Sequence, residues 1–166
     1  MSLLKTVDRA AVRVITYANP PFGTMTATGS TEMFNAIVAA GEDQSVRVVV
    51  ITGGLPGIFI RHYDVGELSD RADAVHSGAP RDPSSSGPRP PGFHALTDMI
   101  ATIEKPVIAA INGLCMGGGF ELSLACACAS SEMPLRHSVC QRPASASFQV
   151  AAAPSACPES SVRPRR

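Results

Sequence analysis

The sequence predicts an α/β fold, in which strands and helices alternate along the chain. Residues 11–17 and 46–51 are β-branched apolar runs, which are typical of strands. Between them, apolar residues recur at helical spacing from Met33 to Val38. A third apolar run, residues 107–111, follows a second helical pattern. Strand, helix, strand is the beginning of a βαβ unit, which favours a sheet covered by helices.

The first βαβ unit has recognisable boundaries. After the strand at 11–17, prolines and a glycine within residues 19–23 predict a loop. We expect a helix from Ser30 or Thr31, because both are good cap residues, and we expect it to stop at Gly41. The run at 46–51 is almost continuously apolar, so we expect that strand to be buried on both faces.

The next stretch is less regular. Residues 59–64 predict a turn, followed by a short helical piece that ends near Leu68. Residues 76–92 are rich in Ser, Pro and Gly and predict a mobile excursion. Apolar spacing then predicts a helix over 93–103, and Lys105-Pro106 introduces the strand at 107–111.

Three consecutive glycines, Gly117, Gly118 and Gly119, open a helix that we expect to run through Ala125. The first N–H groups of a helix lack internal acceptors, and glycine lets another molecule approach them closely. A carbonyl oxygen that gains negative charge is stabilised there, and one such donor is worth roughly 3 kcal/mol in a transition state. Close helix–strand packing without a ligand is the alternative. A P-loop is excluded because no Gly-Lys-Ser/Thr follows.

Glu121 lies in the first turn of this expected helix. A carboxylate there complements the helix dipole and can cap free N–H groups. It can equally act as a general acid or base beside an oxyanion site. Sequence position alone leaves both roles open.

Composition limits the classes of function. Lys+Arg and Asp+Glu both number 14, so nothing global predicts a nucleic-acid partner. No apolar run approaches the roughly 20 residues of a membrane span, and the N-terminus lacks a signal-peptide pattern, so we expect a cytoplasmic protein. The five cysteines are at positions 115, 126, 128, 140 and 157. Their spacing favours reduced thiols and predicts no metal site.

The character of the chain changes after Cys128. Arginines outnumber acids over 129–166, prolines recur, and apolar residues keep no clear period. We therefore expect a folded core over 1–128, interrupted by the excursion at 76–92. Residues 129–166 are predicted to form a divergent, disordered tail.

The run KPVIAAINGLCMGGGFELSLAC, residues 105–126, resembles the central signature of the enoyl-CoA hydratase/isomerase (crotonase) superfamily. VRVVVITG at 46–53, with Asp43 before it, resembles an upstream strand of that family, and residues 19–21 resemble part of its Asn-Arg-Pro turn. The resemblance covers about residues 8–128. It implies the ClpP/crotonase spiral of ββα units, incomplete at the C-terminus.

The resemblance also implies roles for single residues. Gly118 resembles the glycine whose backbone N–H forms half of the family's oxyanion hole. The family's other half comes from a loop reading approximately F-x-A-G-A-D, here residues 59–64, which places Tyr63 at the second N–H donor. Glu121 matches the glutamate that acts as acid/base in hydratases.

The loop at 59–64 departs from the family pattern. Phe59 and Asp64 agree with it, whereas Arg61, His62 and Tyr63 replace small residues and predict a changed pocket shape. We predict substrate contacts from three loop residues and from the first glycine of the three-glycine turn: Arg61, His62, Asp64 and Gly117. Arg61 or His62 can contact a CoA phosphate or transfer a proton. The alternative is that both side chains point to solvent.

The family's second carboxylate lies in a downstream Phe-Gly-x-Pro-Glu run that this chain lacks. A shifted reading frame or a truncated gene is one hypothesis for the divergent tail, and sequencing the encoding DNA tests it. We predict an enzyme of the hydratase or isomerase type that stabilises the enolate of an acyl-CoA thioester. The alternative is an inactive remnant that binds acyl-CoA or associates with a full-length relative.

The partners follow from the same resemblance. CoA enters as part of the substrate, and no metal or redox cofactor is implied. Neither nucleic acid nor a membrane is expected. The family forms trimers or hexamers, so a homo-oligomer is the expectation here, although the helices that complete that trimer are missing from the sequence.

Overall fold

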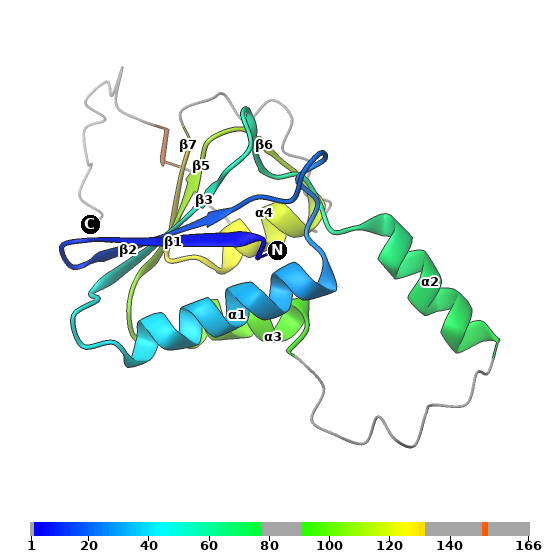
Figure 1. Cartoon of the computed structure of the whole chain (residues 1–166), viewed down its shortest axis with the longest axis horizontal. Coiled ribbons are helices and arrows are strands. Elements are labelled where there is room, and N and C mark those ends of the chain that lie inside the picture. The colour runs from blue at the N-terminus through cyan, green and yellow to red at the C-terminus, as the bar shows by residue number, and fades with distance from the viewer. Residues whose placement is uncertain (1, 78–90, 132–150, 153–166) are drawn as a thin grey trace, which may run out of the picture.

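A computed structural model of the chain describes residues 2–77, 91–131 and 151–152 (Figure 1). Most of the excursion predicted at 76–92 and most of the disordered tail predicted at 129–166 lie outside the described residues. Those two predictions are therefore left untested over 78–90, 132–150 and 153–166.

A six-stranded sheet forms the centre of the structure, in the order β1-β2-β3-β5-β7-β8. Strands β1 and β2 form an antiparallel hairpin, and every later neighbour in the sheet pairs in parallel. The six strands are Leu4–Arg9, Val12–Tyr17, Val48–Gly53, Val107–Ile111, Cys128–Ser131 and Ala151–Ala152. This mixture of strands and crossover helices confirms the predicted α/β class.

Helices α1 (Ala27–Glu42) and α3 (Phe93–Thr102) pack together against one face of this sheet (Figure 1). The core lies between the sheet and these helices, where Ile15 and Ile51 meet Met33, Ile37 and Leu96, all fully buried. Burial of such side chains contributes roughly 1.5–3 kcal/mol each. The core therefore fixes α3 relative to the strands that carry the site.

A second, two-stranded sheet positions the loops of interest. Strand β4 (Ile58–Ile60) pairs in parallel with β6 (Leu114–Cys115), and helix α4 (Gly117–Ala125) begins directly after β6. Helix α2 (Val65–His76) extends away from the body of the molecule (Figure 1). The pairing of β4 with β6 thus places the chain after β4 beside the start of α4.

Several expected boundaries are corrected. Helix α1 begins at Ala27 rather than at residue 30 or 31, and it continues through Gly41. Helix α2 runs to His76 rather than ending near Leu68. Strand β3 is fully buried on one face only, because its other face is partly exposed.

Other expectations are confirmed or extended. Helices α3 and α4 and strands β2 and β5 lie where the sequence placed them. Strands β1, β4, β6 and β8 were not expected. Strand β7 carries the main sheet to Ser131, past the boundary expected at residue 128.

Candidate functional site

The segment between β4 and α2 is held by its backbone against the chain at Gly23 to Met25. Met25 N–H donates to His62 O at 2.8 Å, and Asp64 N–H donates to Met25 O at 2.8 Å. Because N–H groups alternate in direction along an extended chain, the Tyr63 N–H points away from Met25. Among the described residues the Tyr63 N–H has no hydrogen-bond acceptor.

The start of α4 supplies a second free amide. The helix is capped at Met116 without a side-chain hydrogen bond, and the Gly119 N–H turns back to Met116 O at 2.9 Å. Within the part of the chain that the structure describes, the Gly118 N–H has no acceptor. A helix start of this kind carries positive potential from the dipole and the free donors.

Gly118 and Tyr63 lie next to each other. A Cβ built on Gly118 would lie 3.2 Å from the Tyr63 nitrogen, so the two residues are in contact. The Met116 N–H also donates to Arg61 O at 2.9 Å, which ties the two segments together. Two N–H groups without an acceptor among the described residues therefore belong to neighbouring segments.

The Tyr63 side chain is anchored on the other side of its backbone. Its hydroxyl donates to Glu67 Oε2 at 3.2 Å, and the same oxygen accepts the Ala27 N–H at 2.8 Å. Its ring meets Phe93 edge-on, with centroids 5.7 Å apart. Burial, and then the charge of Glu67, raise the pKa of Tyr63, so its hydroxyl stays protonated at neutral pH. Sequence reasoning missed both Glu67 and Phe93.

The remaining predicted loop residues have observed contacts within the protein. Asp64 Oδ1 accepts the Glu67 N–H at 3.2 Å, and its Oδ2 accepts the Thr24 hydroxyl at 3.2 Å, so Asp64 caps α2. His62 Nδ1 donates to Tyr63 O at 2.6 Å, which assigns that nitrogen the proton. Roles for Asp64 and His62 in binding substrate stay predictions.

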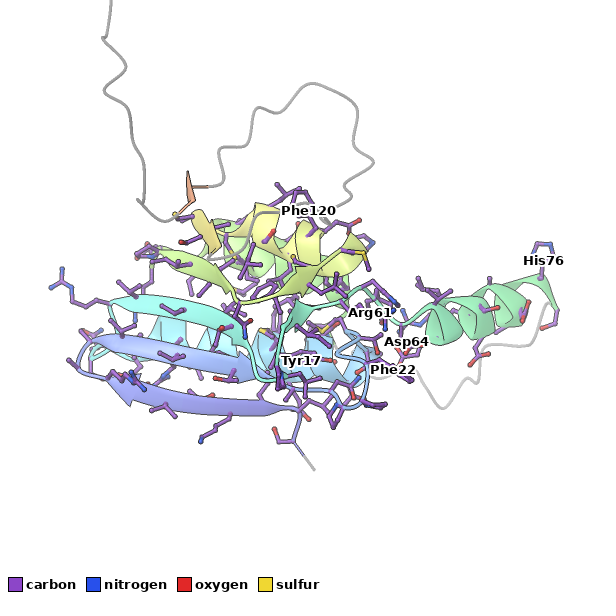
Figure 2. The ribbon with its side chains drawn as sticks, turned by 90° about the horizontal axis from the view of Figure 1, so that it is seen from above. Tyr17, Phe22, Arg61, Asp64, His76 and Phe120 are labelled. Carbon is purple, nitrogen blue, oxygen red and sulfur yellow. The ribbon has the colours of Figure 1, made fainter. Side chains whose placement is uncertain are left out.

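Arg61 and Gly117 stand at the edge of the site. The buried Arg61 Nε has no partner among the described residues, and the residue is half-buried between β4 and α2 (Figure 2). Gly117 is exposed, with a φ of 44°, in the left-handed region that favours glycine. A Cβ there would lie 3.4 Å from His62 Cβ. Contact of either residue with substrate stays a prediction.

Glu121 is exposed and faces an open pocket of about 400 Å³ between α3 and α4. Gly118 and Glu121 are three residues apart on α4, so they share one side of the helix. The wall of the pocket combines residues of both helices: His94, Thr97, Asp98, Ala101, Glu121, Leu124 and Ala125. The pocket wall thus brings Glu121 together with His94 and Asp98 of α3, and Gly118 lies one turn earlier on the helix that carries Glu121.

Two cysteines, one before and one after α4, are buried. Burial raises the pKa of the Cys115 thiol to about 12 and that of Cys126 to about 12, so both are protonated at neutral pH. Cys115, Cys126 and Cys128 are free thiols. Across the described residues no group of three His, Cys, Asp or Glu side chains could hold a metal ion.

Residues 8–131 match the family described as "Enoyl-CoA hydratase/isomerase". The chain belongs to this family. Three quarters of the printed sequence is covered by the match, from β1 to the end of β7. The expected resemblance is therefore confirmed, and the two free amides and Glu121 lie on the segments that carried it.

Named relatives agree with the family. The chain is 41% identical over 91 residues to methylglutaconyl-CoA hydratase, mitochondrial, of Rattus norvegicus, covering 55% of this chain and 26% of that protein. It is 38% identical over 111 residues to carnitinyl-CoA dehydratase of Salmonella enteritidis PT4, covering 67% of this chain and 38% of that protein. The chain thus spans less than half the length of these relatives.

A solved structure shows the same fold. An enoyl-CoA hydratase from Polaromonas sp. JS666 superposes with a TM-score of 0.63 at 29% identity, covering 77% of this chain and 47% of that one. The predicted crotonase-like class is thereby confirmed. Among the described residues, no helix is long and apolar enough to cross a membrane.

Proposed function

We propose that the protein binds an acyl-CoA thioester and stabilises its enolate with the backbone N–H groups of Tyr63 and Gly118. The observation that supports this is the contact between Gly118 and Tyr63, whose backbone N–H groups have no acceptor among the described residues. In such a site a thioester oxygen accepts both hydrogen bonds, and each donor contributes roughly 3 kcal/mol to the transition state.

Glu121 is the acid/base residue of this proposal. It lies one helical turn beyond Gly118 and borders the pocket, so a substrate carbon next to the bound carbonyl can come within its reach. Hydration of a 2-enoyl thioester needs one proton taken from water and one delivered to carbon. The relatives named as a hydratase and a dehydratase favour this reaction type.

Neither a metal nor a redox cofactor takes part in the proposed reaction, since the charge that develops is met by amides and the protons move between side chains. The CoA portion belongs to the substrate. A homo-oligomer and a cytoplasmic location stay predictions.

The test incubates the purified chain with crotonyl-CoA and follows loss of the enoyl-thioester absorbance. We expect Glu121→Gln to lower kcat by about 10²–10⁴-fold, because the carboxylate that transfers the proton is lost. Glu104→Gln, at an exposed glutamate after α3, is the matched control and should keep wild-type turnover.

A thermal-shift titration with CoA esters separates this proposal from the alternative. If ligand raises the melting temperature of a wild-type protein that turns nothing over, the chain is an acyl-CoA-binding remnant rather than an enzyme. Equal turnover by wild type and Glu121→Gln would contradict the role given to Glu121.

A further inference from the structure

The pocket beside Glu121 contains two titratable groups that the family signature does not include. On α3, His94, Thr97, Asp98 and Ala101 follow one another at helical spacing and line one wall. Glu121, Leu124 and Ala125 line the facing wall on α4. An imidazole and two carboxylates therefore border a single space of about 400 Å³.

This space is linked to the two free amides through Phe93, the residue before His94. Phe93 Cζ would lie 3.5 Å from a Cβ on Gly118, and its ring packs edge-on against Tyr63. The His94 ring in turn lies 6.4 Å from the Phe93 ring, centroid to centroid. His94 therefore follows directly after the aromatic residue that packs against both Gly118 and Tyr63.

We propose that His94 is the second proton-transfer residue of the site and works as the acid partner of the base Glu121. The proposal rests on the function proposed above. Histidine is suited to this role because it is the side chain that changes charge between pH 5 and 8. Asp98, four residues away on the same helix, adds a carboxylate to the same wall.

The proton balance of hydration assigns each group one task. The Glu121 carboxylate takes a proton from water as the water oxygen bonds to C3. The electron pair of the C2=C3 bond moves toward the thioester, and its oxygen, held by the two amides, becomes the enolate oxygen. The imidazolium of His94 then gives its proton to C2 as the enolate collapses.

The cycle closes without any further reactant. After the product forms, Glu121 is protonated and His94 is neutral, so a proton passing across the pocket from Glu121 to His94 restores both. The reverse sequence dehydrates the 3-hydroxyacyl thioester. One carboxylate and one imidazole thereby perform the two proton transfers that hydration requires.

The test measures crotonyl-CoA hydration by His94→Gln. We expect kcat to fall by about 10²-fold or more while KM changes by less than about threefold, since the lost group moves a proton rather than binding the CoA. His76→Gln is the matched control. His76 is exposed at the outer end of α2, away from the body of the molecule (Figure 2), so this variant should keep wild-type kcat.

Chemical rescue adds a readout that a structural defect would not show. We expect added imidazole to restore part of the turnover lost by His94→Ala and to leave Glu121→Gln inactive. Circular dichroism and the melting temperature of each variant check that it is folded.

The outcomes separate the two proposals. If wild type turns over, Glu121→Gln does not, and His94→Gln keeps kcat within about threefold of wild type, the role of His94 is overturned while the proposed function stands. If wild type does not hydrate crotonyl-CoA, the proposed hydratase activity fails and the role of His94 falls with it.

Discussion

Gly118 and Gly119 are adjacent in the chain, yet the space around each serves a different purpose. A Cβ on Gly119 would lie 2.0 Å from the carbonyl oxygen of Ile60, so the backbone of β4 occupies that space. A Cβ on Gly118 would meet Tyr63 nitrogen and Cβ at 3.2 Å, which is tight but short of a collision. Gly119 therefore permits close packing against β4, and Gly118 lies against Tyr63.

This difference predicts opposite losses in two alanine variants. Gly119→Ala should lower the free energy of unfolding by about 3 kcal/mol, because β4 or α4 must shift. Gly118→Ala should lose less stability but lower kcat/KM by about 10²-fold, because its methyl group enters the space proposed for the thioester oxygen. Urea unfolding and crotonyl-CoA kinetics measure the two effects. Gly92→Ala, with open space around the Cβ, is the control.

Sequence reasoning named candidate site residues that share one continuous motif, and it did not name residues that approach them only through packing. Gly118 and Glu121 lie within a single recognisable run, and Tyr63 lies in a loop matched to the family by position. His94 and Glu67 reach the site from other helices. The packing of α3 on α4 is set by buried contacts far apart in the sequence, and no local pattern encodes it.

At the scale of elements, the start of α1 shows why a boundary was misplaced. Ser30 resembles a cap, but its hydroxyl donates to Thr26 O at 2.8 Å inside the first turn. The true cap is Thr26, which accepts the Gly29 N–H at 3.0 Å. Gly29 lies in the first turn of this helix, where a Cβ would lie 2.7 Å from the Tyr17 hydroxyl. Packing against a buried tyrosine, rather than chain flexibility, accounts for that glycine.

The other end of α1 explains the lysine that opens the central motif. Helix α1 has no basic residue in its last turn, and Lys105 Nζ instead donates to Ala40 O at 2.8 Å and Asp43 O at 2.6 Å. A cation at a helix C-terminus satisfies free carbonyls and complements the dipole. Lys105 therefore joins the end of α1 to the start of β5.

Lys105→Met should lower the free energy of unfolding by about 2 kcal/mol, since two carbonyls lose a charged donor. Urea unfolding followed by circular dichroism measures it. Lys5→Met, at an exposed position of β1, is the matched control and should change stability by less than about 0.5 kcal/mol. An equal loss in both variants would contradict the capping role of Lys105.

For the whole molecule, the sequence predicted the alternation of strands and helices but not the edge of the sheet. Strand β1 is exposed at five of its six positions, so it lacks the apolar alternation that marks a strand. It exists because its full length pairs with β2, from Leu4 against Tyr17 to Arg9 against Val12. This pairing forms only in the assembled sheet, so the sequence of β1 alone does not predict the strand.

Arg13 ties this edge hairpin to the helix layer. Its guanidinium bonds Asp8 with two nitrogens at 2.8 Å each, and it also reaches Asp43, just after α1, at 2.8 Å. The hydrogen bond from Arg13 lowers the pKa of Asp8. Hydrogen bonds from Ser45 first, and then from Arg13, lower the pKa of Asp43. Both carboxylates therefore titrate below the ordinary value of 3.8 in the folded protein.

The lowered pKa values of Asp8 and Asp43 make the stability of the fold depend on pH. Because the folded pKa values lie below the unfolded ones, the carboxylates stabilise the fold above about pH 4 and lose that contribution as pH falls through the folded values. We expect the urea midpoint of wild type to fall below pH 4. The urea midpoint should fall less steeply with pH in Arg13→Met, in which only the Ser45 hydrogen bonds to Asp43 remain. In the control Arg9→Met, at an exposed position of β1, the midpoint should fall as it does in wild type. Parallel profiles for wild type and Arg13→Met would show that Arg13 does not couple the hairpin to α1.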